Sequence, residues 1–102
     1  MAIINGSTKR GQALLARAAR NEGTDLFEVY GRYSSAKASA MRDCKEWCAK
    51  QNGFNFHICS HTAQAFSVAW NYTDPETGEI MTRIETSRNT YIIDSTRKSE
   101  ED

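Results

Sequence analysis

The residues with the richest chemistry lie in one short stretch of the chain. They are Cys44, Cys48, His57, Cys59 and His61, which include every cysteine and every histidine in the protein. Thiolates and imidazoles are the ligands that tetrahedral zinc prefers. Two cysteines four residues apart would share a helix face, and the alternating residues from 57 to 61 would share a strand face. This stretch is therefore the candidate for metal, redox or nucleophilic chemistry.

The elements that must position these residues argue against a metal site. Phe54, Phe56 and Ile58 must face the helices to form a core. His57 and Cys59 would then point away from the helices, opposite the two helix thiols. The spacing also matches no common zinc pattern. We therefore predict buried structural thiols, with no metal and no cofactor, and keep a small zinc-binding domain as an alternative.

Recognisable catalytic signatures are missing from the sequence. It contains no phosphate-binding loop, dinucleotide-binding fingerprint or nucleophile elbow. The acidic residues are scattered, without a pairing that would suit general acid and base catalysis. We therefore expect a protein that is not an enzyme.

Apolar spacing is typical of helices in the first half of the chain and of strands in the second half. Capping residues and glycines predict helices over residues 8–21, 25–31 and 35–52. Period-two alternation predicts strands over residues 54–60, 65–72, 79–86 and 90–94. The sequence Asp-Pro-Glu-Thr-Gly at 74–78 is a turn signal, because proline fixes one dihedral angle and glycine accepts a left-handed one.

The order of these elements predicts the fold class. Consecutive strands joined by short turns pair with their neighbours, and helices can collect on one face of such a sheet. We expect an α+β, two-layer fold with about three N-terminal helices packed on one face of a three- or four-stranded antiparallel β meander. Residues 1–94 would form a single domain and residues 95–102 a polar, disordered tail. The predicted core side chains are Cys44, Trp47, Cys48, Phe54, Phe56, Phe66, Val68 and Trp70.

Charge is balanced over the whole chain but not along it. The formal net charge is zero, yet the first 52 residues carry nine Lys or Arg against five Asp or Glu. No apolar run is long enough for a membrane span, and the N-terminus lacks a signal peptide. Three cysteines, an odd number, fit reduced thiols. We therefore expect a cytoplasmic protein without a membrane partner.

Without a catalytic site, the expected function is non-enzymatic binding of a macromolecule, with a protein as the leading partner. A two-layer fold leaves the outer sheet face open to solvent. That face would present Asn55, His57, Met81 and Arg83 to the partner. A short meander also leaves two sheet edges, which permits a homodimer.

The basic first helix offers a second contact surface. Its cations precede the first acidic residue of the chain and are Lys9, Arg10, Arg17 and Arg20. A cluster of four cations can follow the phosphates of a nucleic acid, so nucleic-acid binding through this helix is an alternative function. A solvated helix face that complements an acidic sheet is the simpler interpretation.

One resemblance bears on function. Residues 8–18, Thr-Lys-Arg-Gly-Gln-Ala-Leu-Leu-Ala-Arg-Ala, resemble small uncharacterised proteins of bacterial phages and mobile elements, and the turn at 74–78 is similar too. The resemblance contains no catalytic motif and implies no residue roles. It implies an accessory protein that binds and inhibits a host or competing defence system, for example a defence nuclease.

Overall fold

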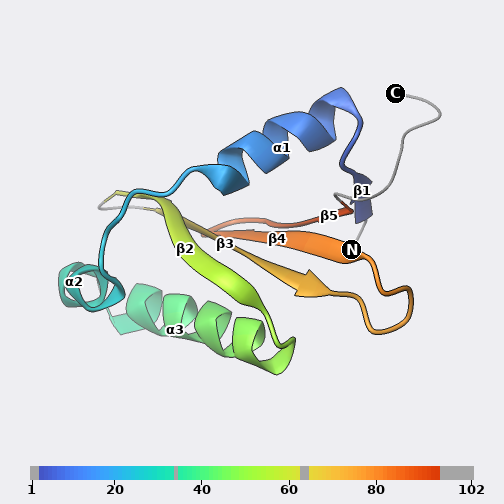
Figure 1. Ribbon diagram of the computed structural model, residues 1–102. Helices are drawn as coiled ribbons and strands as arrows, with labels where there is room; N and C mark the ends of the chain where they lie inside the picture. The colour runs from blue at the N-terminus through green and yellow to red at the C-terminus, as the bar shows by residue number, and fades with distance from the viewer. Residues whose placement is uncertain (1–2, 34, 63–64, 95–102) are drawn as a thin grey trace.

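The computed structural model describes residues 3–33, 35–62 and 65–94, so the tail predicted at 95–102 lies outside the described residues. Three helices and five strands make up the described chain (Figure 1). The helices are α1 (Lys9–Ala19), α2 (Leu26–Arg32) and α3 (Ser35–Lys50). The strands are β1 (Ile3–Asn5), β2 (Phe54–His61), β3 (Phe66–Thr73), β4 (Ile80–Thr86) and β5 (Thr90–Asp94).

Local sequence signals set the ends of the helices. Thr8 caps α1, because its hydroxyl oxygen accepts from the N–H of Gly11 at 3.0 Å. Asp25 caps α2, because its carboxylate accepts from the first turn of that helix at 2.8 Å. Beyond α3, Asn52 turns the chain with a left-handed φ of 53°. The predicted helices are therefore confirmed to within a few residues.

The sheet has the order β1-β5-β4-β3-β2, and its strands are antiparallel except where β1 runs parallel to β5. The prediction of a three- or four-stranded antiparallel meander is right for β2 to β5 and wrong for the whole sheet, which is five-stranded and mixed. Ile3 pairs with Ile92, and Asn5 pairs with Asp94. Three residues are too few to show the alternation that identifies a strand in a sequence, so β1 was not predicted.

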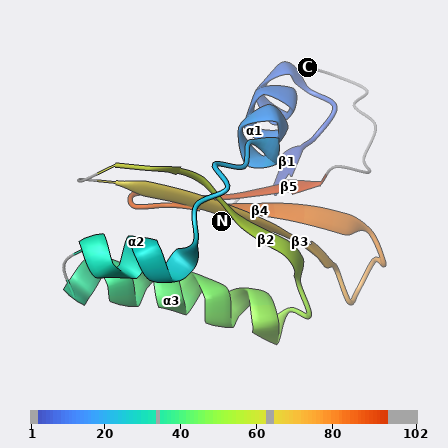
Figure 2. The same ribbon diagram turned by 60° about the vertical axis from the view of Figure 1, so that its left-hand side comes forward.

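Helices cover both faces of the sheet, so the predicted two-layer arrangement is wrong. Helix α1 lies on one face, and α2 and α3 lie on the other (Figure 2). We call these the α1 face and the α3 face. The α1 face needs a cover because it carries Ala69, Ile84 and Ile93, each at most 1% exposed. Leu14 and Leu15 of α1 pack against this cluster, and burial of apolar surface stabilises the third layer.

Two β-bulges in β2 change which side chains face which layer. Phe54 pairs with Asn71 but His57 pairs with Ala69, so β2 holds one extra residue there. Asn55 within this bulge has a left-handed φ of 62°. A second register shift lies between Ile58 and Ser60. Simple alternation along β2 is therefore interrupted twice.

The larger core lies on the α3 face. The predicted core members Cys44, Cys48, Phe66, Val68 and Trp70 are buried in it, and Phe56 packs against it partly buried. Two predicted core residues are not buried: Trp47 is 50% exposed and Phe54 is 49% exposed. The bulge explains Phe54, because it separates this ring from Phe56, which stacks on Trp70 with ring centroids 5.7 Å apart.

Candidate functional site

The cysteines and histidines of the sequence cluster are divided between the layers. Cys44 and Cys48 lie in the core of the α3 face, whereas Cys59 lies in the core of the α1 face. His57 is also on the α1 face, where it contacts Ala18 of α1. Among residues 3–33, 35–62 and 65–94, no group of three potential metal ligands comes together. The two helix thiols thus lie on the opposite side of the sheet from His57 and Cys59, as the strand pattern predicted.

His61 does not lie on the face predicted for it, because of the second bulge. Simple alternation predicts His61 on the face of His57 and Cys59. Instead its ring packs edge-on to Tyr33, which ends α2, with centroids 6.1 Å apart. Its Nε2 lies 3.7 Å from the carboxylate of Glu22. The bulge therefore separates the two histidines by the thickness of the sheet.

The three thiols are poor nucleophiles and poor metal ligands as they stand. Burial, together with a smaller effect of the nearby carboxylate of Glu85, raises the pKa of Cys44 to about 12, although the positive charge of Arg83 acts in the opposite direction. Burial also raises the pKa of Cys48 and of Cys59. Because the reactive form is the thiolate, protonated thiols at neutral pH fit a structural role.

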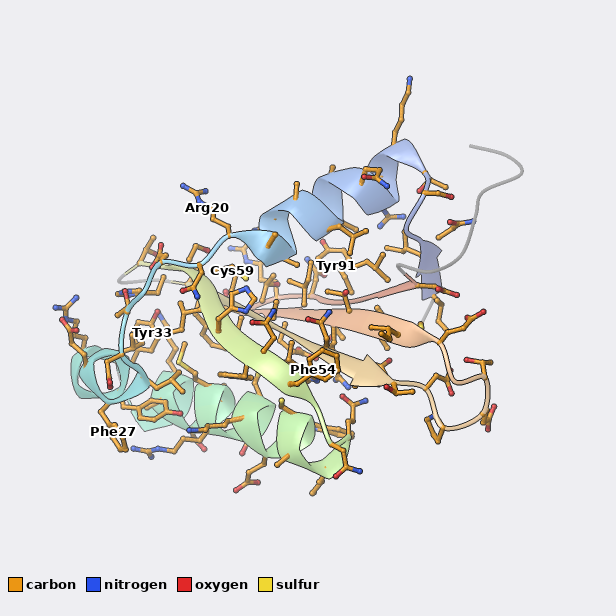
Figure 3. All side chains as sticks on the ribbon, viewed as in Figure 1. Arg20, Phe27, Tyr33, Phe54, Cys59 and Tyr91 are labelled. Carbon is orange, nitrogen blue, oxygen red and sulfur yellow. The ribbon has the colours of Figure 1, made fainter. Side chains whose placement is uncertain are left out.

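His57 and Cys59 anchor α1 to the sheet. The Nε2 of His57 and the thiol of Cys59 both approach the carbonyl oxygen of Ala18, in the last turn of α1. The Nδ1 of His57 lies 2.7 Å from the carbonyl oxygen of Asn55. Both ring nitrogens thus lie against backbone carbonyl oxygens, one in β2 and one in α1. Figure 3 shows Cys59 in the layer between α1 and the sheet.

A groove of about 520 Å³ opens on the other side of the sheet. Helix α3 packs chiefly on β2 and β3, which leaves part of β4 and β5 uncovered. We call this concavity the α3 groove. Its helical wall includes Ala40, Cys44 and Trp47, and its floor on the sheet includes Arg83, Glu85 and Thr90.

The polar groups on the floor of the α3 groove satisfy one another. The Nε of Arg83 donates to Glu85 at 2.7 Å, and a terminal nitrogen of the same guanidinium donates at 2.6 Å. The hydroxyl of Thr90 lies 2.8 Å and 2.9 Å from the two oxygens of Glu85. Charge on the floor is therefore neutralised internally, as burial of an ion pair requires.

Two tryptophans hold the guanidinium of Arg83. It lies 4.9 Å from the ring centroid of Trp47 and 5.4 Å from that of Trp70. Trp70 is fully buried, whereas half of Trp47 remains exposed at the wall of the groove. Cation–π contacts of this kind are stronger when they are desolvated, so Arg83 fixes the position of an accessible aromatic ring.

The four residues predicted to share the outer sheet face do not lie on one common surface. Met81 and Arg83 face α3, with 2% and 9% exposure, so the prediction that they point outward is wrong. The reason is that β4 places Ile84 on the α1 face, which turns its odd-numbered neighbours toward α3. Asn55 is exposed in β2, an edge strand of the sheet, and His57 is half-buried beside α1.

The α3 groove was missed because Trp47 was assigned to the core. Its position on the helix, three residues after Cys44, placed it on the apolar stripe. A usable signal was Arg83 and Glu85, two residues apart on a strand and therefore on one face. An opposite-charge pair beside a helix that carries tryptophan indicates a polar floor rather than an apolar core.

The cations predicted for the basic first helix are exposed, whereas the apolar side of that helix packs on the α1 face. Lys9, Arg10, Arg17 and Arg20 all lie on the surface, and the first turn of α1 has no acidic residue. Figure 3 shows Arg20 pointing away from the body of the protein.

Comparisons add no family to these observations. No described helix is long and apolar enough to cross a membrane. The chain matches no protein-family model, no curated protein and no solved structure.

Proposed function

We propose that the protein is a non-catalytic module that binds a segment of a protein partner in the α3 groove. The observation that carries the proposal is Trp47, a half-exposed tryptophan held at the wall of a groove of about 520 Å³. Tryptophan is among the residues that most often dominate binding energy at protein interfaces. Positions held rigid before binding lose less entropy on association, and the stacking with Arg83 provides that rigidity.

The chemistry of the groove favours an apolar anchor from the partner. Arg83 and Glu85 already pair with each other, so a charged ligand group would have to break this pair. An apolar or aromatic side chain can instead pack on Trp47 and Ala40 without displacing a hydrogen bond. Because Arg83 and Glu85 would keep their hydrogen bonds when such a side chain binds, neither would be left buried without a partner.

A peptide-display selection against the whole protein tests this proposal. Peptides selected by the wild-type chain should carry an aromatic or aliphatic anchor. The variant Trp47→Ala should weaken their binding by about 2 kcal/mol or more, which is about thirtyfold. Because half of this ring is exposed, the variant should remain folded, as its circular dichroism can show.

Phe27 provides the matched control. It is 82% exposed on α2, outside the groove, and Figure 3 shows it pointing away from the protein. The variant Phe27→Ala removes an exposed aromatic ring of similar character and should leave peptide binding unchanged. Equal losses in the two variants, or selected peptides that bind Trp47→Ala as well as wild type, would contradict the proposal.

The resemblance of residues 8–18 to small phage and mobile-element proteins extends the proposal to a class of partner. That partner would be a component of a bacterial defence system, such as a nuclease. Expression in a phage-restricting host should increase plaque formation, and Trp47→Ala should remove the increase. Unchanged restriction across several defence systems would contradict this extension, while peptide binding in the groove would still be tested separately.

A further inference from the structure

A second pocket lies where the C-terminal half of α1 approaches the turn between β4 and β5. Its volume is about 330 Å³, near the lower end of the range for small-molecule sites. Polar side chains from α1, β2, β3, the β4–β5 turn and β5 line it, and they include Arg17, Ser60, Ser67, Arg88, Asn89 and Tyr91. We call it the Arg17–Arg88 pocket. No acidic residue is among the described residues that line it.

Ser67 supplies an unexplained polar group beneath this pocket. The residue is 1% exposed, and its hydroxyl oxygen has no hydrogen-bond partner in the described part of the protein. The hydroxyl does interact with the thiol of Cys59 and lowers its pKa, but a thiol is a weak hydrogen-bond partner and leaves most of the hydrogen-bonding capacity of the hydroxyl unused. A buried hydroxyl that keeps unused donor and acceptor capacity is costly, so its retention needs an explanation.

Both arginines are available to a ligand. Arg17 and Arg88 are exposed, and neither forms an ion pair with an acidic residue in the described ranges. Burial raises the pKa of Cys59, while the Ser67 hydroxyl and then the charge of Arg17 lower it, and Glu22 raises it. Arg17 therefore lies close enough to Cys59 for its charge to act on this thiol.

We propose that the Arg17–Arg88 pocket binds the phosphate group of a small molecule. Guanidinium groups present paired N–H donors that match phosphate oxygens, and such charge-assisted hydrogen bonds are stronger than neutral ones. Two unpaired arginines match the charge of a phosphate dianion, and serine hydroxyls add donors of the kind that phosphate sites use. The concave shape and limited volume favour a small phosphate compound over a nucleic-acid backbone.

Calorimetric titration of the full chain with inorganic phosphate tests this site. Wild type should show saturable binding with one site per chain. Arg17→Gln and Arg88→Gln should each weaken binding by about tenfold or more, since each removes a charge-assisted contact. Arg10→Gln is the matched control, because it removes the same charge from α1 without lining the pocket. Its affinity for phosphate should equal that of wild type.

The variant Ser67→Ala probes the floor of the site. It should retain or raise the melting temperature, because it removes an unsatisfied buried hydroxyl, and it should weaken phosphate binding severalfold. A parallel titration with adenosine monophosphate distinguishes the source of the group: tighter binding than inorganic phosphate indicates a phosphate ester, and equal binding indicates the free ion.

Three results would overturn the proposal. One is the absence of saturable binding at millimolar phosphate. Another is an equal loss in Arg10→Gln and Arg17→Gln, which would show only diffuse attraction to the basic helix. The third is binding of duplex DNA with no response to phosphate or adenosine monophosphate, which would assign the arginines to nucleic acid. None of these results depends on peptide binding in the α3 groove.

Discussion

At the scale of single residues, burial decides what the cysteines can do. The sequence places all three near histidines, which invites a chemical interpretation. The structure buries all three as free thiols, and burial favours the neutral form. Their contribution is therefore to packing, and their protonation is coupled to folding.

The raised pKa of Cys44 predicts a loss of stability in alkaline solution. Its pKa is about 12 in the folded protein against an ordinary 9.0. Between these values the unfolded chain has lost the proton and the folded chain has kept it. The free energy of unfolding should therefore fall as pH rises above 9, by up to about 1.4 kcal/mol per pH unit.

Urea unfolding of wild type and Cys44→Ala at several pH values measures this effect. Tyr30, Tyr33 and Tyr72 also have pKa values raised by burial, so the difference between the two proteins isolates the thiol. The variant should lose less stability than wild type between pH 9 and the pKa of about 12. Parallel pH profiles would show that Cys44 ionises freely in the folded state.

At the scale of helices and strands, local features could be predicted from the sequence and features that depend on strand pairing could not. Helix ends followed from Thr8 and Asp25, because capping is a local interaction. The faces of β2 did not follow, because a bulge depends on how two strands pair. The packing of α1 on the second face of the sheet could not be predicted either. Ala69 is a small residue that alternates with larger ones in β3, and this pattern is typical of a weakly apolar face that is open to solvent.

Contact between α1 and β1 depends on Gly11, although helix propensity alone disfavours glycine at this position. In helix propensity, glycine costs up to about 1 kcal/mol relative to alanine. A Cβ on Gly11 would lie 2.1 Å from the carbonyl oxygen of Asn5 and 2.8 Å from the Cα of Gly6. Gly11→Ala should therefore destabilise the protein by about 1–3 kcal/mol, because backbone must move.

Gly31 in α2 is the matched control for this variant. A Cβ at that position meets nothing within 4 Å, so Gly31→Ala should stabilise the protein by up to about 1 kcal/mol. Thermal unfolding of the two variants should give shifts of opposite sign. A gain in stability for Gly11→Ala would mean that α1 does not approach β1 this closely.

For the whole molecule, stability rests on a sheet that is buried on both faces. Trp70 is central to the larger core: it is fully buried, stacks on Phe56 and donates from Nε1 to Gln51 at 2.9 Å. A domain of this size is typically stable by about 5–15 kcal/mol. Loss of one such side chain can therefore remove a large part of the total.

Replacing each tryptophan in turn should distinguish a core side chain from a groove side chain by its effect on the free energy of unfolding. Trp70→Ala should lower the free energy of unfolding by about 3–5 kcal/mol. Trp47→Ala should lower it far less, because half of that ring is exposed. Urea unfolding measures both, with Trp70→Phe as a milder variant if the alanine protein does not fold. Equal losses would contradict the division between core and groove.

The parallel pairing of β1 with β5 has a consequence for synthesis of the chain. Ile3 finds its partner Ile92 only after almost all of the described sequence has left the ribosome. Contacts between such distant positions slow folding, because a large loop must close first. Leu14 and Leu15 have no finished surface to cover until then. The nascent polypeptide therefore exposes its first amphipathic segment until β5 has been synthesised.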